Sequence, residues 1–324
     1  MTGPPVLVTR PLQPEVMAFL HERCRVEVPR EDRAMPREEL LEGVAGKHGL
    51  LAMLTDRVDG EVLDAAGPAL RVVANMAVGY DNVDLEACTR RGVLVTNTPD
   101  VLTDATADLT WGLILAASRR IVEGDRLMRS GRGWAWSPSF MLGREVTGKT
   151  LGVVGFGRIG RAVARRAEGF GMPVVHHARR PAPEPRGAEH RPLEDLLAEA
   201  DVVSVHLPLT EETRHRFGAP EFRAMRPTAV FVNTSRGPVV DEAALAAALR
   251  HGEIAAAGLD VYEREPEAHP DLLALENVVL APHLGSATVE TRTAMGMLSA
   301  RNLVEALTGG RPPTPVNAVS EPRP

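Results

Sequence analysis

The stretch Leu151-Gly-Val-Val-Gly-Phe-Gly-Arg-Ile-Gly160 decides how this 324-residue chain is interpreted. Its first four residues form an apolar run typical of a buried strand, and Gly155, Gly157 and Gly160 follow in the spacing G-x-G-x-x-G. Segment 161–170 has apolar residues at helical spacing and ends before a glycine. The first glycine allows a tight turn, the second lets the backbone approach a pyrophosphate, and the third lets the helix pack on the strand. This order predicts a dinucleotide-binding unit, with the phosphates at the helix N-terminus.

The composition excludes several other classes of protein. Hydrophobic residues make up 44% of the chain and charged residues 25%, which is ordinary for a globular protein. The net charge of −6 lacks the excess of positive charge that is typical of nucleic-acid-binding proteins. No window has the length of a membrane span, and the N-terminus lacks a signal-peptide pattern. Cys24 and Cys88 make neither a disulfide framework nor a metal-ligand cluster. We therefore expect a cytoplasmic protein with no nucleic-acid or membrane partner.

Alternating strands and helices predict two domains, which the chain length also favours. In the first part, strands are expected at 5–10, 26–28, 49–54, 71–74 and 93–96, with helices at 14–22, 36–44, 58–65 and 85–91. The second series has strands at 151–154, 174–177, 202–206, 229–233, 258–261 and 278–281, with helices at 193–200, 220–225 and 242–250. A helix over 289–307 follows the complete nucleotide domain and is assigned back to the first domain.

The predicted fold class is α/β, with two doubly wound parallel-sheet domains. The Rossmann dinucleotide-binding domain is expected over 100–286. The smaller, flavodoxin-like substrate domain is discontinuous and comprises 1–99 plus 287–324.

Residues 103–143 join the two series and are rich in tryptophan. A single long helix is expected over 103–129, followed by an irregular segment that holds Trp134, Trp136 and Phe140, with Trp111 just before it. The segment either packs on its own domain or contacts a second copy of the chain. Aromatic residues are favoured at interfaces, so we expect a homodimer with 103–140 at the contact.

Three expected strand ends present polar groups of complementary chemistry. Ligands of open parallel sheets bind beyond the carboxyl ends of the strands. Arg236 follows the strand at 229–233, Asp260 and Glu265 lie at the next strand end, and His283 follows the strand at 278–281. An arginine, carboxylates and a histidine at one sheet edge are the candidate chemical site.

These motifs resemble the D-isomer-specific 2-hydroxyacid dehydrogenase family, and most closely its glyoxylate/hydroxypyruvate reductase branch. The resemblance covers nearly the whole chain, through segments 73–82, 96–108, 151–160, 233–237, 258–266 and 282–285. It implies that the catalytic residues are Arg236, Glu265 and His283, and that the chain reduces small 2-oxo acids to D-2-hydroxy acids with a nicotinamide cofactor and no metal.

The resemblance also implies a role for each catalytic residue. His283 is the general acid that protonates the developing alkoxide. Glu265 orients the imidazole and stabilises its protonated form. Arg236 binds the substrate carboxylate and polarises the carbonyl. The substrate site is completed by Leu54 and by the backbone N–H groups of Val78 and Gly79.

The glycine turn and the family resemblance together assign the cofactor-binding residues. They are Thr106, Gly155, Phe156, Gly157, Arg158, Ile159, Gly160, Ala178, Arg179, Arg180, His206, Pro208, Thr213, Thr234, Ser235, Asp260, His283 and Gly285.

The end of the second nucleotide-domain strand bears on the choice of cofactor. An acidic residue there bonds the ribose 2′-hydroxyl of NAD. Here Ala178 occupies that position, and Arg179 and Arg180 follow. Guanidinium groups bind a 2′-phosphate through charge-assisted hydrogen bonds, whereas a carboxylate would repel it. The pattern predicts a preference for NADP(H) with NAD(H) still accepted; the alternative is two solvated arginines in an arginine-rich chain.

Other functions remain as alternatives. Small residues in 53–56 and 77–79 favour a small acid. The phosphoglycerate branch of the family that the chain resembles carries basic residues near 54–56, and their lack here argues against that type. Val78 stands where the phosphite-oxidising branch has lysine, while a D-lactate type remains open. A corepressor-like protein that senses dinucleotides shares this fold, but it would leave the catalytic set without a role.

Overall fold

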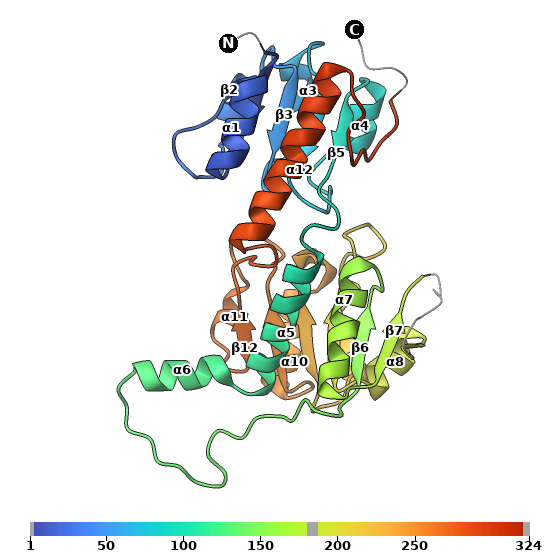
Figure 1. The fold of residues 1–324 in the computed structure, drawn as a ribbon. Coiled ribbons are helices and arrows are strands. Elements are labelled where there is room, and N and C mark those ends of the chain that lie inside the picture. The colour runs from blue at the N-terminus through green and yellow to red at the C-terminus, as the bar shows by residue number, and fades with distance from the viewer. Residues whose placement is uncertain (1–2, 180–186, 320–324) are drawn as a thin grey trace. The chain divides into compact units, whose positions relative to one another are not determined.

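Short apolar runs between helix-forming segments build two parallel sheets, each in its own unit of the chain (Figure 1). The computed structural model describes residues 3–179 and 187–319. Unit 1 comprises Met1–Leu102 and Thr288–Pro324, and unit 2 comprises Thr103–Ala287. The boundaries expected from the sequence lie within three residues of these.

Unit 1 contains a five-stranded parallel sheet in the order β2-β1-β3-β4-β5. Its strands are β1 (Pro5–Val8), β2 (Arg25–Glu27), β3 (Gly49–Ala52), β4 (Val72–Asn75) and β5 (Leu94–Thr96). Its helices are α1 (Pro14–Arg23), α2 (Arg37–Val44), α3 (Gly60–Ala66), α4 (Leu85–Arg90) and α12 (Val289–Thr308). Every residue of β3 and β4 is buried, as expected for central strands of a parallel sheet.

Helices cover both faces of the unit 1 sheet (Figure 1). α12 packs against β3, β4 and α1, although it comes from the far end of the sequence. Apolar side chains of α2, α3 and α4, among them Leu40, Val62 and Cys88, join the core that covers the other face. Both sides of each central strand are therefore removed from water, which stabilises the sheet.

Unit 2 contains a seven-stranded parallel sheet in the order β12-β11-β10-β9-β6-β7-β8. Its strands are β6 (Leu151–Val154), β7 (Val174–His177), β8 (Glu189–His190), β9 (Val202–Val205), β10 (Val230–Asn233), β11 (Ala256–Leu259) and β12 (Val278–Leu280). Its helices are α5 (Thr103–Ser118), α6 (Ile121–Arg129), α7 (Arg158–Ala167), α8 (Leu193–Glu199), α9 (Ala219–Ala224), α10 (Glu242–His251) and α11 (Pro270–Leu273), with 3-10 turns at Glu168–Phe170 and Gly237–Val239.

The strand order of unit 2 reverses between β6 and β9, which is the switch point of a Rossmann fold. α5 and α7 bury Trp111, Ile114 and Val163 against one face of the sheet. α8, α9 and α10 bury their apolar side chains against the other face, where Phe217 and Phe231 lie in the core. Two doubly wound parallel-sheet domains confirm the predicted fold class.

The single helix expected over 103–129 is wrong. The chain breaks at Arg120, which has a left-handed backbone conformation with φ 55°, and α5 and α6 are separate helices. The apolar face of α5 is buried in unit 2, whereas α6 has no buried residue. The returning chain also closes the end of α5, because the N–H of Arg144 donates to the carbonyl of Ser118 at 2.7 Å. The core therefore ends where the first helix ends.

Smaller differences have similar causes. The helix after the glycine turn begins at Arg158 rather than at 161, and its last expected turn is 3-10. β11 begins at Ala256, two residues before the expected strand, because two alanines that favour a helix are buried in the sheet. The short elements β8 and α11 were not expected from the sequence.

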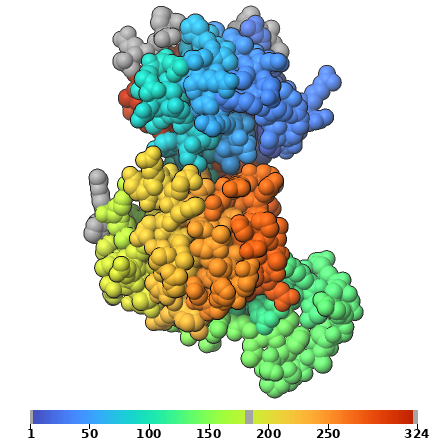
Figure 2. Space-filling view, turned by 180° about the vertical axis from the view of Figure 1, so that it is seen from behind, coloured from blue at the N-terminus to red at the C-terminus, as the bar shows by residue number. Residues whose placement is uncertain are grey.

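Residues 119–145 form an arm that extends away from the rest of unit 2; Figure 2 shows it as a separate green lobe. Trp134 and Trp136 are 52% and 77% exposed on it. Trp111 is buried and does not lie on the arm, although the sequence places it with these two tryptophans at the expected contact. Its ring stacks on Phe170 at 4.4 Å and its Nε1 donates to the carbonyl of Val163 at 3.0 Å, so it is a core residue.

Candidate active site

The turn after β10 presents Arg236, and the side chain of Asn233 builds that turn. Asn233 Oδ1 accepts hydrogen bonds from the backbone N–H of Ser235 at 3.0 Å and from its hydroxyl at 2.7 Å. Asn233 Nδ2 donates to the carbonyl of Arg236 at 3.0 Å. At Gly237 a Cβ atom would lie 1.8 Å from the backbone of Tyr262, so only glycine lets this turn approach the segment after β11.

Asp260 ties the end of β11 to the loop after β12. The residue is 1% exposed, and its carboxylate accepts hydrogen bonds from the N–H groups of Leu284 at 2.6 Å and Gly285 at 2.8 Å. Its carbonyl accepts from the N–H of His283 at 2.9 Å. Burial raises the pKa of Asp260, and the backbone hydrogen bonds act in the opposite direction. The carboxylate holds in place the loop on which His283 lies.

His283 and Glu265 form a direct pair. The Nδ1 of His283 lies 2.8 Å from Oε2 of Glu265, and the two side chains are 27% and 30% exposed. Because the carboxylate accepts, Nδ1 donates, and Nε2 is the nitrogen available to a substrate. The other carboxylate oxygen of Glu265 accepts from the N–H of Tyr262 at 3.2 Å, which fixes the carboxylate.

The sheet register brings the three strand ends together. Asn233 pairs with Leu259, and Leu259 pairs with Leu280, so β10, β11 and β12 end side by side. His283 contacts Glu265 directly. Arg236 joins them through the close approach of Gly237 to the segment that leads to Glu265.

The glycine turn has the geometry that its spacing predicts. Gly155 has φ 94°, and a Cβ atom on it would lie 2.5 Å from the carbonyl oxygen of His206. A Cβ atom on Gly160 would lie 2.2 Å from the carbonyl oxygen of Gly155. Gly157, in contrast, faces open space, and it caps α7 without a side-chain hydrogen bond. The first N–H groups of α7 therefore suit a phosphate, and the turn fits a dinucleotide.

The other predicted cofactor-binding residues near this turn come from α7, from the start of α5 and from the strand-end loops. Arg158 and Ile159 begin α7, and Phe156 is buried within the turn. Thr106 is also buried, and its hydroxyl donates to the carbonyl of Gly285 at 3.1 Å. One helical turn further on, the hydroxyl of Thr110 lies 2.9 Å from that of Thr234. The start of α5 is thereby joined to two of the strand-end loops.

The loop after β9 supplies further predicted cofactor-binding residues. The ring of His206 bonds Ser204 through Nε2 at 2.8 Å, while its buried Nδ1 has no partner within residues 3–179 and 187–319. Burial lowers the pKa of His206 to about 3, so the ring is neutral at physiological pH. The hydroxyl of Thr213 donates to the carbonyl of Pro208 at 2.6 Å and closes the loop.

At the end of β7 the structure describes only part of the predicted 2′-phosphate site. Ala178 directly follows the strand, and Arg179 is exposed. A hydrogen bond from Thr210 and, more weakly, the charge of Arg179 lower the pKa of Glu212, which places Glu212 within electrostatic reach of that arginine. Arg180 lies outside the described residues.

In unit 1 the predicted substrate residues lie on loops that asparagine side chains hold. The Nδ2 of Asn97 donates to the carbonyl of Val78 at 2.8 Å, and that of Asn75 donates to the carbonyl of Gly79 at 3.0 Å. The backbone N–H groups of Val78 and Gly79 make no hydrogen bond to the part of the chain that the structure describes. The carbonyls are thus fixed while the N–H groups remain available to a carboxylate.

The loop that contains Leu54 is held in a similar way. Leu54 is 37% exposed, and the Nδ2 of Asn82 donates to the carbonyls of Met53 at 3.1 Å and Asp56 at 2.9 Å. Asp56 is buried, accepts from the N–H of Met53 at 2.7 Å and from the hydroxyl of Thr9, and its pKa is raised by burial.

Sequence reasoning missed these supporting polar residues, namely Asp56, Asn75, Asn82 and Asn97. One available signal was position, because Asn75 ends β4 and Asn97 directly follows β5. Polar residues at the carboxyl ends of parallel strands lie at the functional edge of the sheet.

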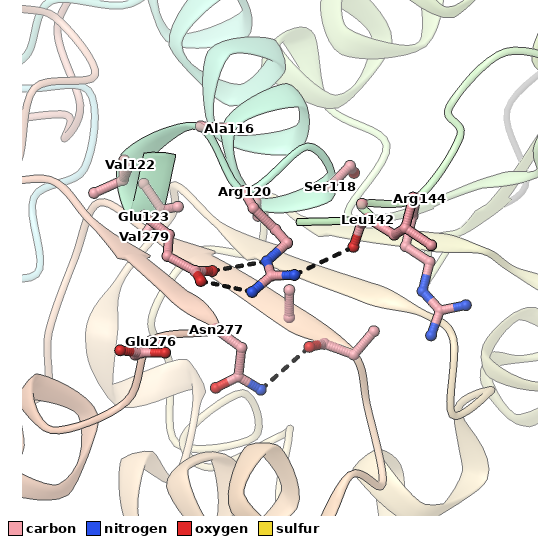
Figure 3. A pocket seen from close by; sticks show the side chains of 14 residues that line it. Ala116, Ser118, Arg120, Val122, Glu123, Leu142, Arg144, Glu276, Asn277 and Val279 are labelled. Carbon is pink, nitrogen blue, oxygen red and sulfur yellow. Dashed lines mark hydrogen bonds and ion pairs between the residues drawn. The ribbon is translucent and has the colours of Figure 1, made fainter. Parts of the chain in front are cut away.

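A separate cavity of about 360 Å³ lies at the amino ends of the unit 2 strands, opposite to the strand ends that hold the candidate active site (Figure 3). Ala256 at the start of β11 and Asn277 just before β12 line it. Arg120 and Glu123 form a double ion-paired hydrogen bond there, at 2.7 and 2.6 Å. Because it lies at the amino ends of these strands, this cavity is not the candidate active site.

The described parts of the chain show neither a metal-binding cluster nor a membrane-spanning helix. No group of three histidine, cysteine, aspartate or glutamate side chains is placed to hold a metal ion. None of the helices there is long and apolar enough to cross a membrane.

Comparison with known proteins gives a consistent result. Residues 111–285 match the model of the NAD-binding domain of D-isomer specific 2-hydroxyacid dehydrogenases. The glyoxylate reductase of Thermococcus gammatolerans is 53% identical over 321 residues, which cover 97% of this chain and 96% of that protein. The chain belongs to the D-isomer specific 2-hydroxyacid dehydrogenase family. Membership confirms the resemblance inferred from the motifs and makes this dehydrogenase an NAD(P)-dependent oxidoreductase.

Solved structures agree with the family assignment. The TT0316 protein of Thermus thermophilus has a TM-score of 0.92 and 49% identity, and the match covers 97% of this dehydrogenase and all of that chain. An NADPH-dependent glyoxylate/hydroxypyruvate reductase of Sinorhizobium meliloti, in complex with NADP and malonate, has a TM-score of 0.84 and 36% identity, with 97% of both chains covered.

Proposed function

We propose that this dehydrogenase reduces glyoxylate to glycolate and hydroxypyruvate to D-glycerate, with NADPH as the preferred cofactor. The main support is the Glu265–His283 pair, 2.8 Å apart, at the strand end beside the Arg236 turn. Curated relatives about half identical in sequence are named glyoxylate reductases, which favours the same substrate here.

The chain's own residues account for the proton and the charges of the reaction. A bound nicotinamide cofactor would supply the hydride that the carbonyl carbon of the 2-oxo acid takes up. His283 donates a proton from Nε2 to the oxygen that becomes the hydroxyl, while Glu265 holds Nδ1 and so orients the ring. Arg236 binds the substrate carboxylate and polarises the carbonyl.

Substrate size is assigned to the unit 1 loops. The backbone N–H groups of Val78 and Gly79 are proposed to bind the carboxylate of the substrate. Leu54 is proposed to limit the size of the substituent on the other side of the substrate's carbonyl group. The phosphoglycerate, phosphite and D-lactate types and the dinucleotide-sensing corepressor type are the competing functions.

A steady-state assay tests the proposal. NADPH oxidation should be fastest, in kcat/KM, with glyoxylate or hydroxypyruvate, and slower with pyruvate or 3-phosphohydroxypyruvate. His283→Ala should lower kcat by about 100-fold or more. No turnover with any 2-oxo acid, despite dinucleotide binding, would favour the corepressor type.

The cofactor preference rests on the end of β7. Ala178 leaves no carboxylate to repel a 2′-phosphate, and the exposed Arg179 offers a guanidinium. The Sinorhizobium relative is described as NADPH-dependent. We expect kcat/KM to be higher with NADPH than with NADH; the reverse order would refute this preference.

We also propose that the dehydrogenase is a homodimer. Its arm exposes Ile121, Met128, Trp134, Trp136 and Leu142, each more than half exposed. Such apolar exposure on an extended segment favours a protein partner, and a second copy is the simplest one. The contact is proposed for 121–142 rather than 103–140, because α5 packs within its own unit. We propose a cytoplasmic location for the dehydrogenase. Its two cysteines are buried and form no disulfide, which is consistent with the reducing conditions of the cytoplasm.

A further inference from the structure

Three of the chain's ten histidines gather at the carboxyl ends of β7 and β8. His176 and His190 are paired in the sheet register, and their rings meet edge to face with centroids 5.4 Å apart. The rings of His177 and His190 stack at 6.0 Å. This is the strand end at which Ala178 and Arg179 begin the proposed 2′-phosphate site, and no role in the reaction uses these histidines.

Two of the rings are bonded so that each can take a second proton. The Nε2 of His190 lies 3.3 Å from the carbonyl oxygen of Ala178, and the Nδ1 of His177 lies 3.1 Å from the carbonyl oxygen of Arg191. A carbonyl only accepts, so these nitrogens are the donors, and protonation of the other ring nitrogen keeps both hydrogen bonds. The charge of each ring can therefore change without rearrangement of the strand end.

His176 has a different role. It is 1% exposed, its Nδ1 has no partner among the described residues, and its ring stacks on Phe156 at 4.0 Å. Burial lowers the pKa of His176, and the nearby charges of His190, Arg161 and His177 act in the same direction. This ring is a neutral support that links the cluster to the glycine turn.

The described charged groups around the cluster make their ion pairs with one another. Arg191 is the partner of Glu189 at 2.5 Å and of Glu199 on α8 at 3.1 Å. Arg161 on α7 contributes positive charge, and Glu212 from the loop after β9 interacts with Arg179. Within residues 3–179 and 187–319, no ion pair joins a carboxylate to either His177 or His190.

We propose that His177 and His190 determine cofactor specificity in a pH-dependent way, by adding positive charge beside the 2′-phosphate of NADPH when they are protonated. The inference rests on the proposed preference for NADPH. Histidine is the side chain that changes charge between pH 5 and 8. A single positive charge one Debye length, ~8 Å, from a phosphate would strengthen its binding about two- to threefold, so two such charges would contribute about fivefold.

Binding of two cofactor fragments isolates this effect. The dissociation constants of 2′,5′-ADP and 5′-AMP differ only through the 2′-phosphate, and calorimetry measures both near pH 6 and near pH 8 at constant ionic strength. The test variant combines His177→Asn with His190→Gln, which place amide N–H groups where Nδ1–H and Nε2–H now donate. His251→Gln, at the exposed end of α10, is the matched control.

The expected result is a change in the preference for 2′,5′-ADP over 5′-AMP. Near pH 6 this preference should be about fivefold greater in the wild type and in the His251 variant than in the double variant, and near pH 8 all three should agree within about twofold. Comparison at one pH cancels the titration of the phosphate itself, which gains negative charge as pH rises. His190→Gln alone should show about half of the effect on a logarithmic scale.

Two outcomes would overturn the proposal and identify the reason. If the double variant matches the wild type at both pH values, or loses the same preference at both, then the histidines do not act through their charge. If 2′,5′-ADP binds the wild type no more tightly than 5′-AMP at either pH, the NADPH preference is itself wrong and the inference fails with it.

Discussion

Replacement of Glu265 by glutamine tests the proposed acid most directly. The variant Glu265→Gln keeps the size of the side chain and one neutral oxygen that can accept from His283 Nδ1, but it removes the charge that faces Nδ1 at 2.8 Å and the oxygen that accepts from the N–H of Tyr262. A hydrogen bond to a charged partner contributes about 1.5–3 kcal/mol and a neutral one about 0.5–1.5 kcal/mol. The two side chains are 27% and 30% exposed, so we take the lower part of this difference, about 1 kcal/mol.

A loss of about 1 kcal/mol lowers kcat/KM for glyoxylate about fivefold. The assay is steady-state NADPH oxidation, with the dissociation constant of NADPH and the thermal midpoint measured on the same preparations. Both should stay at the wild-type value, because the substitution leaves the glycine turn and the core unchanged.

A double-mutant cycle adds a sharper condition. Since Glu265 is proposed to act through His283, the variant that combines Glu265→Gln with His283→Asn should be no slower than His283→Asn alone. His215→Asn is the control, because His215 pairs with Glu263 at 3.2 Å outside the proposed site. Full additivity of the two losses, or a kcat/KM of Glu265→Gln within the error of the wild type, would refute the proposed pairing.

The remaining predictions concern the cofactor, the substrate loops, the arm and the thiols. Arg179→Ala should raise KM for NADPH about tenfold and leave KM for NADH within about twofold, as loss of a charge-assisted bond to phosphate requires; equal changes would contradict the assignment. Asn82→Ala should raise KM for glyoxylate about tenfold, since it frees the loop at Met53, whereas Asn277→Ala, which removes bonds to two unit 2 carbonyls, should lower the melting temperature without that change in KM. Light scattering at micromolar concentration should give twice the monomer mass of 34.9 kDa, and a monomer mass would count decisively against the homodimer. Cys88, whose pKa burial raises to about 12, should not react with a thiol reagent near pH 8 until the protein is unfolded, and rapid labelling of the native protein would show that the site opens.

Local chemistry made the fold class predictable from the sequence alone. The glycine spacing at 155, 157 and 160 reflects backbone conformation and close approach within one turn, so no distant residue is needed to interpret it. The buried strands are short apolar runs, and a parallel sheet covered on both faces requires such runs. The strand-end rule then predicts that Arg236, Glu265 and His283 lie at one edge of the sheet.

Contacts between distant segments were decided only by the tertiary structure. The pairing of Glu265 with His283 depends on neighbouring strands ending at the same edge, and the asparagine bonds to Met53, Val78 and Gly79 depend on loops from three strands. The break at Arg120 also has no local signal, because segment 103–129 favours one helix throughout. What ends α5 is the edge of the unit 2 core, and a sequence pattern does not show where a core ends.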